Sequence, residues 1–518
     1  MQVTETKTKI LTKKNIAIAI SAIGLPIALA ITLINYTENA KDAEARNVMM
    51  ETMKTKGCVA DGLLTGSGGD TGTLIASINR SQCQYLHRSI ETWTTPPDFA
   101  LIAENMKKIK KPGIIYSMFL AEAIGLDSKY NYPDGSGQFD FPAMCKNGSQ
   151  EFWGPGTCKA NFASKEYRKY LSYITKQAID LGVQSFLIGQ IYFQDVGSSR
   201  NSIAPEIISE MRQYAKSKGK VITIGAQTND IEDPNYLKLF DYIEGGVGID
   251  DVGNIENGAC FSRWWKKPGD RCWALLWNEK FASKANNVIL NFDWSGLEYD
   301  DMSKFARMNK SNREKTLKNL YQMFASRKVG FLMPFLAVVY RDNNGCYGPN
   351  SEYYSPDNKY SCKDEDFMNS VLQKGFVTNG AQFVSQIVPS RMIAGEKYQV
   401  SVTMKNIGTG DWSKAGGYRL GSQNPQDNNF WNRRVEFSNT ENILPGQNKV
   451  FDFQVTAPAT PGIYNFQWKM VQEGFEWFGG LTQNMIINIE SNPNVQTAPS
   501  ITTTTFIPFS STTSTTIR

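Results

Sequence analysis

The chain has 518 residues, of which 41% are hydrophobic and 20% are charged. This is an ordinary balance for a folded protein, but the length exceeds that of a typical single domain, so we expect at least two domains. Lys and Arg outnumber Asp and Glu by only 55 to 50. So small an excess argues against a nucleic-acid partner, which would require a concentrated basic surface.

The N-terminal region contains one long apolar segment. Residues 16–34, IAIAISAIGLPIALAITLI, carry no charge, and as a helix they nearly cover the hydrocarbon core of a bilayer. Four lysines lie between residues 7 and 14, so the positive-inside rule places the N-terminus in the cytoplasm. We expect a single-pass membrane protein whose bulk is extracellular. A cleaved signal peptide, with a cleavage site near Ala43 and Ala45, is the alternative.

Eight cysteines lie between the apolar segment and residue 375. Their even number, and their grouping into four couples that are adjacent in the sequence, indicate disulfides formed in an oxidising compartment. The predicted pairs are Cys58 with Cys83, Cys145 with Cys158, Cys260 with Cys272, and Cys346 with Cys362. Because the chain has one histidine and no CxxC motif, we expect neither a metal site nor a cofactor.

The central region alternates between apolar, β-rich runs and amphipathic helical stretches, a pattern typical of βα units around a parallel sheet. The expected strands are 72–78, 113–120, 183–193, 220–227, 242–249, 287–294 and 329–339. The expected helices are 96–109, 166–182, 204–219 and 312–328. About seven such units without a phosphate-binding glycine fingerprint favour a TIM-like α/β barrel over an open doubly wound sheet.

Near residue 375 the pattern changes to alternating strands with turns at Gly395, Gly446 and Gly462, which predicts an all-β immunoglobulin-like sandwich. After it comes a Thr/Ser-rich stretch that has too few apolar residues to build a core. The predicted organisation is a cytoplasmic basic segment (1–14), a transmembrane helix (15–36), a stalk (37–57), the disulfide-stapled barrel (58–374), the sandwich (378–490) and a disordered tail (491–518).

The sandwich region carries a more specific signal. It contains the sequences KNIGTGDW, TAPATPG, FQWKM and EGFEWFG, with tryptophans at Trp412, Trp431, Trp468 and Trp477. With these motifs, residues 379–489 resemble the four-tryptophan immunoglobulin-like domain of autophagy cargo receptors and of many prokaryotic surface proteins. The resemblance implies a β-sandwich with an interaction role and no catalysis. We expect the four indoles to pack in the core, and an exposed platform for sugars or peptides is the alternative.

Candidate site residues follow from the barrel, because barrel enzymes place their active sites at the carboxyl ends of the strands. Acidic residues stand at five predicted strand ends: Glu122, Asp195, Asp230, Glu244 and Asp293. Amide, aromatic and basic side chains that we expect at the same mouth are Gln190, Tyr192, Gln227, Asn291, Trp294 and Arg341. Carboxylates, amides and aromatic rings together suit a carbohydrate.

Glycoside cleavage requires two carboxyl groups, and we predict Glu122 and Asp293 as the pair, with Glu244 as a substitute for either. The single histidine, His87, lies close to a predicted disulfide, so we expect a structural or surface role for it. The barrel resembles those of glycoside hydrolases in outline. The leading hypothesis is thus a membrane-anchored, extracellular glycoside hydrolase-like protein that acts on or binds a cell-surface or environmental glycan, or a cell-envelope component.

Two other functions stay open at this stage. The first is a non-catalytic adhesin or assembly protein, in which a degenerate barrel serves as a rigid binding body. The second is metal-dependent deacetylation or phosphoester hydrolysis, which would require a cup of aspartates without histidine. For any single acid, the simpler interpretation is a helix cap or an ion pair with a nearby arginine.

Overall fold

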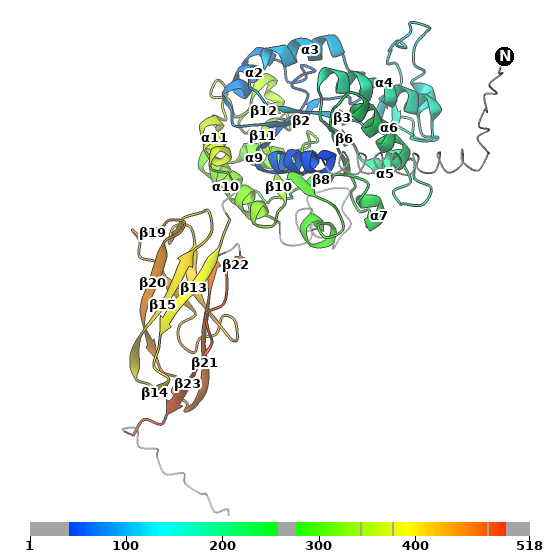
Figure 1. Cartoon of the computed structure of the whole chain (residues 1–518). Helices are drawn as coiled ribbons and strands as arrows, with labels where there is room; N and C mark the ends of the chain where they lie inside the picture. Colours follow the sequence, from blue (N-terminus) through cyan, green and yellow to red (C-terminus); the bar gives the residue numbers. More distant parts are fainter. Residues whose placement is uncertain (1–40, 257–275, 342–343, 376–377, 474–475, 494–518) are drawn as a thin grey trace, which may run out of the picture. The chain divides into compact units, whose positions relative to one another are not determined.

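The computed structural model describes residues 41–256, 276–341, 344–375, 378–473 and 476–493 (Figure 1). The chain divides into two compact units, Met1–Val377 and Thr378–Arg518. The predicted transmembrane helix, the pair Cys260 and Cys272, and most of the predicted tail lie outside the described residues. No helix in the described ranges is both long and apolar enough to cross a bilayer.

The first unit is built on a curled sheet of parallel strands surrounded by helices (Figure 1). Its strands, in the order of their pairing, are β1 (Gly57–Ala60), β2 (Tyr85–Ile90), β3 (Ile115–Leu120), β6 (Ser185–Ile188), β7 (Thr223–Gln227), β8 (Tyr242–Gly246), β9 (Val288–Asn291), β10 (Gly330–Phe331) and β11 (Met333–Val338). β10 pairs with β9 and β11 pairs with β1, yet only Leu332 separates β10 from β11. The strand pairings therefore return to their starting point, as the expected barrel requires.

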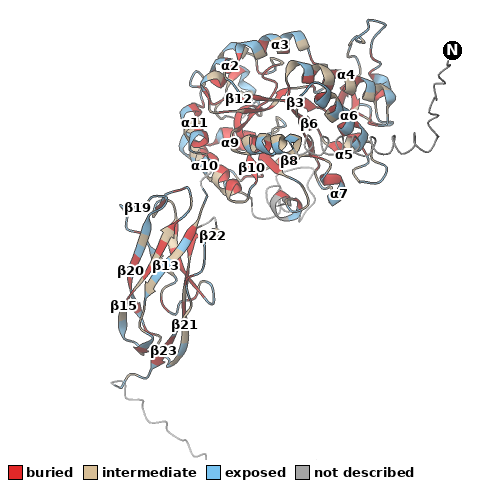
Figure 2. Cartoon of the chain, in the orientation of Figure 1, coloured by how far each residue is buried: buried red, intermediate tan, exposed pale blue. Residues whose placement is uncertain are grey.

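Helices follow most of the strands and cover the outside of the sheet, so the strands are buried and the helices expose their outer faces (Figure 2). They are α2 (Thr71–Arg80), α3 (Phe99–Lys108), α4 (Lys165–Leu181), α5 (Ile191–Gln194), α6 (Ala204–Ser217), α7 (Pro234–Leu237), α9 (Asp301–Arg307), α10 (Lys310–Ser326), α11 (Glu365–Lys374) and a π-helix (Leu276–Phe281). Helix α4 shows why the sequence forms these elements. The Ser164 side chain caps its first turn by accepting from the Tyr167 amide, and left-handed Gly182 ends it.

One expected strand is wrong. Residues 72–78 form most of helix α2, with Asp70 capping its first turn. Leu74, Ile75 and Ile78 share one buried face, so the apolar run has helical rather than alternating spacing. Strands β1 and β2 were not predicted from the sequence, since β1 has only four residues and no flanking pattern.

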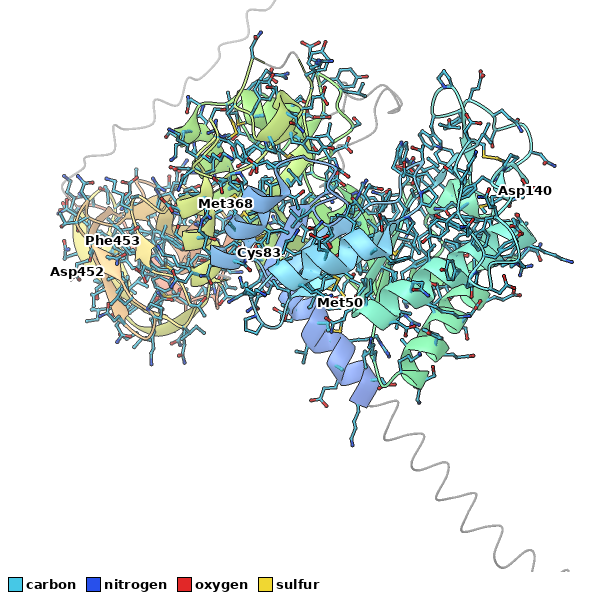
Figure 3. All side chains as sticks on the ribbon, turned by 90° about the horizontal axis from the view of Figure 1, so that it is seen from above. Met50, Cys83, Asp140, Met368, Asp452 and Phe453 are labelled. Carbon is cyan, nitrogen blue, oxygen red and sulfur yellow. A yellow bond between two sulfur atoms is a disulfide. The ribbon has the colours of Figure 1, made fainter. Side chains whose placement is uncertain are left out.

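Residues 41–55 are helical and cover the amino ends of the barrel strands. Met50 and Met53 are buried, and the Met53 sulfur lies 3.6 Å from the hydroxyl of Thr223, the first residue of β7. Figure 3 labels Met50 on this helix. The expectation of a separate stalk over residues 37–57 is therefore wrong for this segment, because its apolar face belongs to the barrel core.

Three of the predicted disulfides are present: Cys58 with Cys83, Cys145 with Cys158, and Cys346 with Cys362. The first joins β1 to the segment before β2. The second closes an excursion that follows β3 and contains the short antiparallel pair β4 (Ala123–Gly125) and β5 (Thr157–Lys159), with a 3-10 turn at Pro142–Met144. The third braces the segment after β11, which contains a 3-10 turn at Pro349–Ser351 and β12 (Tyr353–Tyr354).

The second unit is a sandwich of antiparallel sheets with one parallel edge pair. One sheet contains β13 (Ala381–Ile387), β15 (Lys397–Asn406) and β20 (Asn448–Thr456). The other contains β14 (Arg391–Ile393), β23 (Met485–Glu490), β21 (Gly462–Gln472), β17 (Tyr418–Gln423), β18 (Arg434–Glu436) and β22 (Glu476–Phe478), and a small ladder joins β16 (Trp412–Ser413) to β19 (Asn442–Ile443). Inward and outward residues alternate along the long strands β15 and β20, as in the neighbouring pair of exposed Asp452 and buried Phe453, both labelled in Figure 3.

Three of the four tryptophans pack in the core of the sandwich. Trp412 and Trp468 are fully buried, and Trp431 is 5% exposed. Trp477 is only half-buried, and the Arg434 guanidinium lies over its ring at 4.8 Å from the centroid. The expected core role therefore holds for three indoles, whereas the fourth takes part in a cation–π contact at the edge.

Candidate active site

The carboxyl ends of several neighbouring strands bring together polar side chains inside the barrel. Glu122 comes two residues after β3, Glu244 lies within β8, and Asn291 ends β9. Gln227 ends β7 and is the direct cross-strand partner of Glu244. Since strands of a parallel barrel all end at the same rim, residues far apart in the sequence meet here.

Glu122 is a buried carboxyl group in an apolar environment. Its side chain accepts a hydrogen bond from the Gln190 amide through Oε1, while Oε2 has no hydrogen-bond partner among the described residues. Burial raises the pKa of Glu122 to about 7, against the opposing effects of its own backbone, Arg88 and Gln190. A carboxyl group in this environment keeps a large protonated fraction, about one half, at neutral pH and is suited to donate a proton.

Glu244 is equally buried but has the opposite protonation preference. Its Oε1 accepts from the side-chain amide of Asn291 and lies 3.6 Å from His87 Nε2. Burial opposes ionisation, yet contacts with His87, Asn291 and Gln227 together hold the pKa of Glu244 below its ordinary value. Two carboxyl groups of one site therefore differ in charge near neutral pH, as acid–base chemistry requires.

His87 lies on β2 inside the barrel and is fully buried, so a surface position is ruled out. Its Nδ1 forms a hydrogen bond of 2.9 Å with the Tyr85 hydroxyl. Burial lowers the pKa of His87 despite the nearby Glu244, so the imidazole is neutral at neutral pH. We assign it the structural role of supporting the Glu244 carboxylate.

Two glutamines connect the carboxyl groups. The Gln190 side chain donates to Glu122, its backbone amide donates to Gln227 Oε1 at 3.2 Å, and Gln227 lies directly opposite Glu244 on the neighbouring strand, where it helps to lower the Glu244 pKa. The preceding residue must be small, because a Cβ atom on Gly189 would lie 2.1 Å from Glu122 Oε2. Gly189 therefore allows the carboxyl group to reach this position.

A second charged cluster lies beside the first. The Arg88 guanidinium lies 3.3 Å from Asp61, forms an ion pair with Glu91, and lies over the rings of Phe119 and Trp294. Trp294 Nε1 donates to Asp61 Oδ2 at 3.0 Å. Burial raises the pKa of Asp61 to about 7 even with Arg88 close by. Asp61, Arg88 and Glu91 were not predicted as site residues, because they lie on or directly after β1 and β2, which were not predicted from the sequence.

The remaining predicted residues fall into two groups. Burial raises the pKa of Tyr192 well above its usual range, and the nearby charges of Glu122, Asp230 and Asp293 add to this rise. The Tyr192 hydroxyl donates to Gln190 Oε1 at 2.5 Å, which links it to the chain of hydrogen bonds. Asp293 is half-buried and Asp230 is exposed.

Asp195 and Arg341 do not belong to this arrangement. The buried Asp195 carboxylate accepts from the Ser202 hydroxyl, the Ile203 amide and the Tyr236 hydroxyl at 2.5, 3.1 and 2.8 Å. It therefore holds the start of α6 in place. Arg341 is 79% exposed and faces Glu352 at 3.6 Å. These two predictions are wrong because strand-end position does not by itself determine the direction of a side chain.

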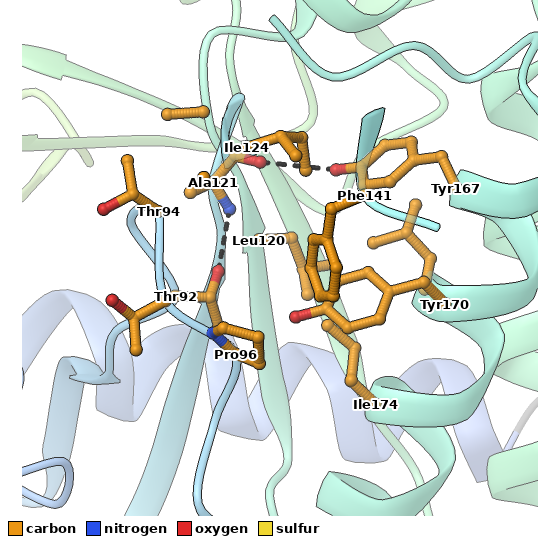
Figure 4. Close-up of a pocket in the computed structure, with 14 residues that line it drawn as sticks. Thr92, Thr94, Pro96, Leu120, Ala121, Ile124, Phe141, Tyr167, Tyr170 and Ile174 are labelled. Atoms are coloured by element: carbon orange, nitrogen blue, oxygen red, sulfur yellow. Dashed lines mark hydrogen bonds between the residues drawn. The ribbon is translucent and has the colours of Figure 1, made fainter. Parts of the chain in front are cut away.

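The segment that carries Glu122 is supported by close packing against α4 (Figure 4). The Thr92 hydroxyl accepts from the Ala121 amide at 3.1 Å, and the Tyr167 hydroxyl donates to the Ala121 carbonyl at 3.3 Å. The cavity between these elements holds about 10 Å³, which is room for no more than one water molecule. The residues around this cavity support the segment that carries Glu122, and the cavity itself is too small for a sugar.

Comparison with solved structures finds glycoside hydrolase-like barrel enzymes at low identity. The cyclic α-maltosyl-(1→6)-maltose hydrolase of Arthrobacter globiformis is 12% identical, with a TM-score of 0.36, over 78% of this chain and 92% of that chain. The debranching enzyme of Nostoc punctiforme is 9% identical, with a TM-score of 0.37, over 78% and 88%. A GH27 β-L-arabinopyranosidase of Geobacillus stearothermophilus is 10% identical, with a TM-score of 0.32, over 79% and 98%. At these values the likeness carries no argument about the reaction.

No protein-family model and no curated protein matches the chain. The resemblance of residues 379–489 to the four-tryptophan domain therefore stays a prediction.

Proposed function

We propose that the barrel unit hydrolyses a glycosidic bond, with Glu122 as general acid and Glu244 as the carboxylate partner. The observation that carries this proposal is the pair of buried carboxyl groups, linked through Gln190 and Gln227, whose surroundings favour opposite protonation states. In glycoside cleavage one carboxyl group protonates the leaving oxygen, and the other acts as nucleophile or activates water. The two environments fit that division of roles.

The proposal changes the pair expected from the sequence. Asp293 was the predicted partner of Glu122, with Glu244 as a substitute, but hydrogen bonds join Glu122 to Gln190 and Gln190 to Gln227, which is the cross-strand partner of Glu244. Asp293 is half-buried, and its charge contributes to the raised pKa of Tyr192. It is the second candidate for the base, and its variant belongs in the same experiment.

The experiment measures the release of reducing ends from a panel of polysaccharides by the full chain and by the variants Glu122→Gln, Glu244→Gln and Asp293→Asn. Removing a general acid or base lowers turnover by about 10²–10⁴-fold. We expect losses of that size for Glu122→Gln and Glu244→Gln, and a smaller loss for Asp293→Asn. The exposed Glu298→Gln variant is the matched control and should keep full activity.

A product assay by nuclear magnetic resonance then reports whether the anomeric configuration is retained or inverted. Retention assigns Glu244 as the nucleophile and inversion assigns it as the base. Full activity in the Glu122→Gln, Glu244→Gln double variant would overturn the assignment of the pair.

A second candidate function is glycan binding without cleavage. It is favoured by the burial of both carboxyl groups, since Glu122 is 1% and Glu244 is 2% exposed. A substrate must reach the acid, and such burial restricts that access. Binding on a glycan array without release of reducing ends from any bound glycan would favour this function over hydrolysis.

The proposal extends to location. We propose that the protein works outside the cytoplasm, held at the membrane by residues 16–34. The three disulfides support this, because such bonds persist in oxidising compartments. Extraction of native membranes with alkaline carbonate tests the anchor: the full chain should stay in the membrane pellet, whereas its release into the supernatant would indicate a cleaved leader.

A further inference from the structure

A group of four aromatic side chains forms a partly exposed surface beside the candidate site. We call Trp93, Phe152, Trp153 and Phe193 the aromatic platform. Trp93 is 37% exposed and Phe152 is 47% exposed, while the other two are half-buried. Ring centroids lie 5.2 Å apart for Trp93 and Trp153, and 5.3 Å apart for Phe152 and Phe193.

The aromatic platform is continuous with the mouth of the barrel. The ring of Phe193 lies 4.4 Å from that of Tyr192, which donates to Gln190 in the site. On the other side, the amide of Ala160 donates to the carbonyl of Glu122 at 2.8 Å, directly after the excursion that carries Phe152 and Trp153. The aromatic platform therefore adjoins both Tyr192 and the segment that carries Glu122.

The excursion is held in a fixed shape. The disulfide between Cys145 and Cys158 closes it, and β4 pairs with β5 at its base. Inside the excursion, the amide of Glu151 donates to the carbonyl of Thr157 at 2.6 Å. A preorganised surface of this kind loses little conformational entropy when it binds a ligand.

Two lysines border the aromatic platform. The Lys159 ammonium lies over the Phe152 and Phe193 rings, at 3.4 and 4.0 Å from their centroids. Lys146 donates to the carbonyl of Phe193 at 3.2 Å. In the ranges that the structure describes, neither ammonium has a carboxylate within salt-bridge distance. The platform thus combines ring faces with positive charge that no acidic side chain of the described chain neutralises.

We propose that the aromatic platform binds an acidic sugar residue, of the uronic acid class, belonging to the same glycan chain that enters the barrel. This inference rests on the proposed function. The partly exposed Trp93 indole offers a ring face to the apolar face of the sugar, while Lys159, which lies over the Phe152 and Phe193 rings, and Lys146 attract the sugar carboxylate. The substrate is accordingly an anionic polysaccharide rather than a neutral one.

The test measures binding of defined hexasaccharides to the full chain by titration calorimetry, in the Glu244→Gln background so that no probe is cleaved. The probes are the hexamers of galacturonate, glucuronate and mannuronate, with maltohexaose as the neutral counterpart. We expect at least one uronate hexamer to bind at least ten-fold more tightly than maltohexaose, and its affinity to fall with rising salt.

Two variants locate the binding to the aromatic platform. Trp93→Ala and Lys159→Met should each weaken binding of that uronate hexamer about ten-fold, which corresponds to about 1.4 kcal/mol. The matched control is Phe430→Ala, which removes a comparably exposed ring (42%) from the sandwich unit and should leave affinity unchanged.

The outcomes separate this inference from the proposed function. Absence of binding to every uronate hexamer, or unchanged affinity in both Trp93→Ala and Lys159→Met, overturns the platform even if the protein cleaves a glycan. Conversely, uronate binding that depends on both residues supports the platform even if no cleavage is found. Equal binding of maltohexaose overturns the acidic character of the ligand.

Discussion

Replacing Glu122 by glutamine should stabilise the barrel at alkaline pH while it removes the proposed general acid. The pKa of this carboxyl group rises from an ordinary 4.5 to about 7 because of burial. A group with a raised folded-state pKa contributes stability below its unfolded pKa and loses it as the pH rises through the folded value. For Glu122 this loss spans the interval from 4.5 to about 7 and amounts to about 3 kcal/mol.

Glutamine imitates the protonated carboxyl group and keeps an acceptor for the amide of Gln190. We therefore expect Glu122→Gln to exceed the wild type in unfolding free energy by about 3 kcal/mol at pH 8.5, with convergence below pH 4.5. Urea denaturation followed by far-ultraviolet circular dichroism suits this measurement, because the helical signal comes from the barrel: the described residues of the sandwich unit contain no helix.

The control for this prediction is Glu298→Gln, an exposed carboxyl group in the same unit. It removes no buried carboxyl group, so it should not reproduce the gain in unfolding free energy expected of Glu122→Gln at pH 8.5. The reasoning is refuted if Glu122→Gln is no more stable than the wild type at pH 8.5, or if its advantage is the same at every pH. A variant that is more stable but inactive would fit the trade-off between stability and activity that arises when a functional group is held in an unfavourable environment.

Three other predictions concern the packing beside the site and the stability of each unit. Gly189→Ala places a Cβ atom against the Glu122 carboxylate, so reducing-end release should fall at least ten-fold in the standard assay. The double variant Cys58→Ser, Cys83→Ser opens a loop of 25 residues and should lower the unfolding free energy of the barrel by about 3 kcal/mol in urea. Trp468→Ala leaves a cavity in the sandwich and should destabilise that unit by about 3–5 kcal/mol, seen as faster hydrogen exchange there, with glycan cleavage unchanged.

The sequence predicted the barrel because most of its elements carry a clear period. Helices α4, α6 and α10 lie within two or three residues of the expected ranges, since their buried residues recur at helical spacing and α4 ends at a glycine. The first two strands escaped notice because β1 has four residues, and because the apolar run of α2 resembled a strand. Local pattern is weakest where an element is short.

The candidate site was predicted in part for the same reason. Glu122, Glu244, Asn291, Gln190 and Gln227 come from strands that were recognised, and they lie together.

The sequence alone does not show in which direction a side chain points or which groups surround it. Asp195 stands at a strand end like Glu122, yet it caps α6. The difference between the pKa values of Glu122 and Glu244 depends on partners that come from other strands, such as His87. Only tertiary packing supplies those partners.

The helix over residues 41–55 packs at the amino ends of the barrel strands and forms the floor of the barrel, whereas the acidic site lies at the opposite rim, at the carboxyl ends of the strands. The chain reaches this unit at the floor, because β1 begins at Gly57 immediately after the helix. A tether or affinity tag on the N-terminal side of residue 41 therefore attaches to this unit at the end away from the acidic site. Immobilisation through the N-terminus is accordingly the natural geometry for presenting the site to long, insoluble glycans.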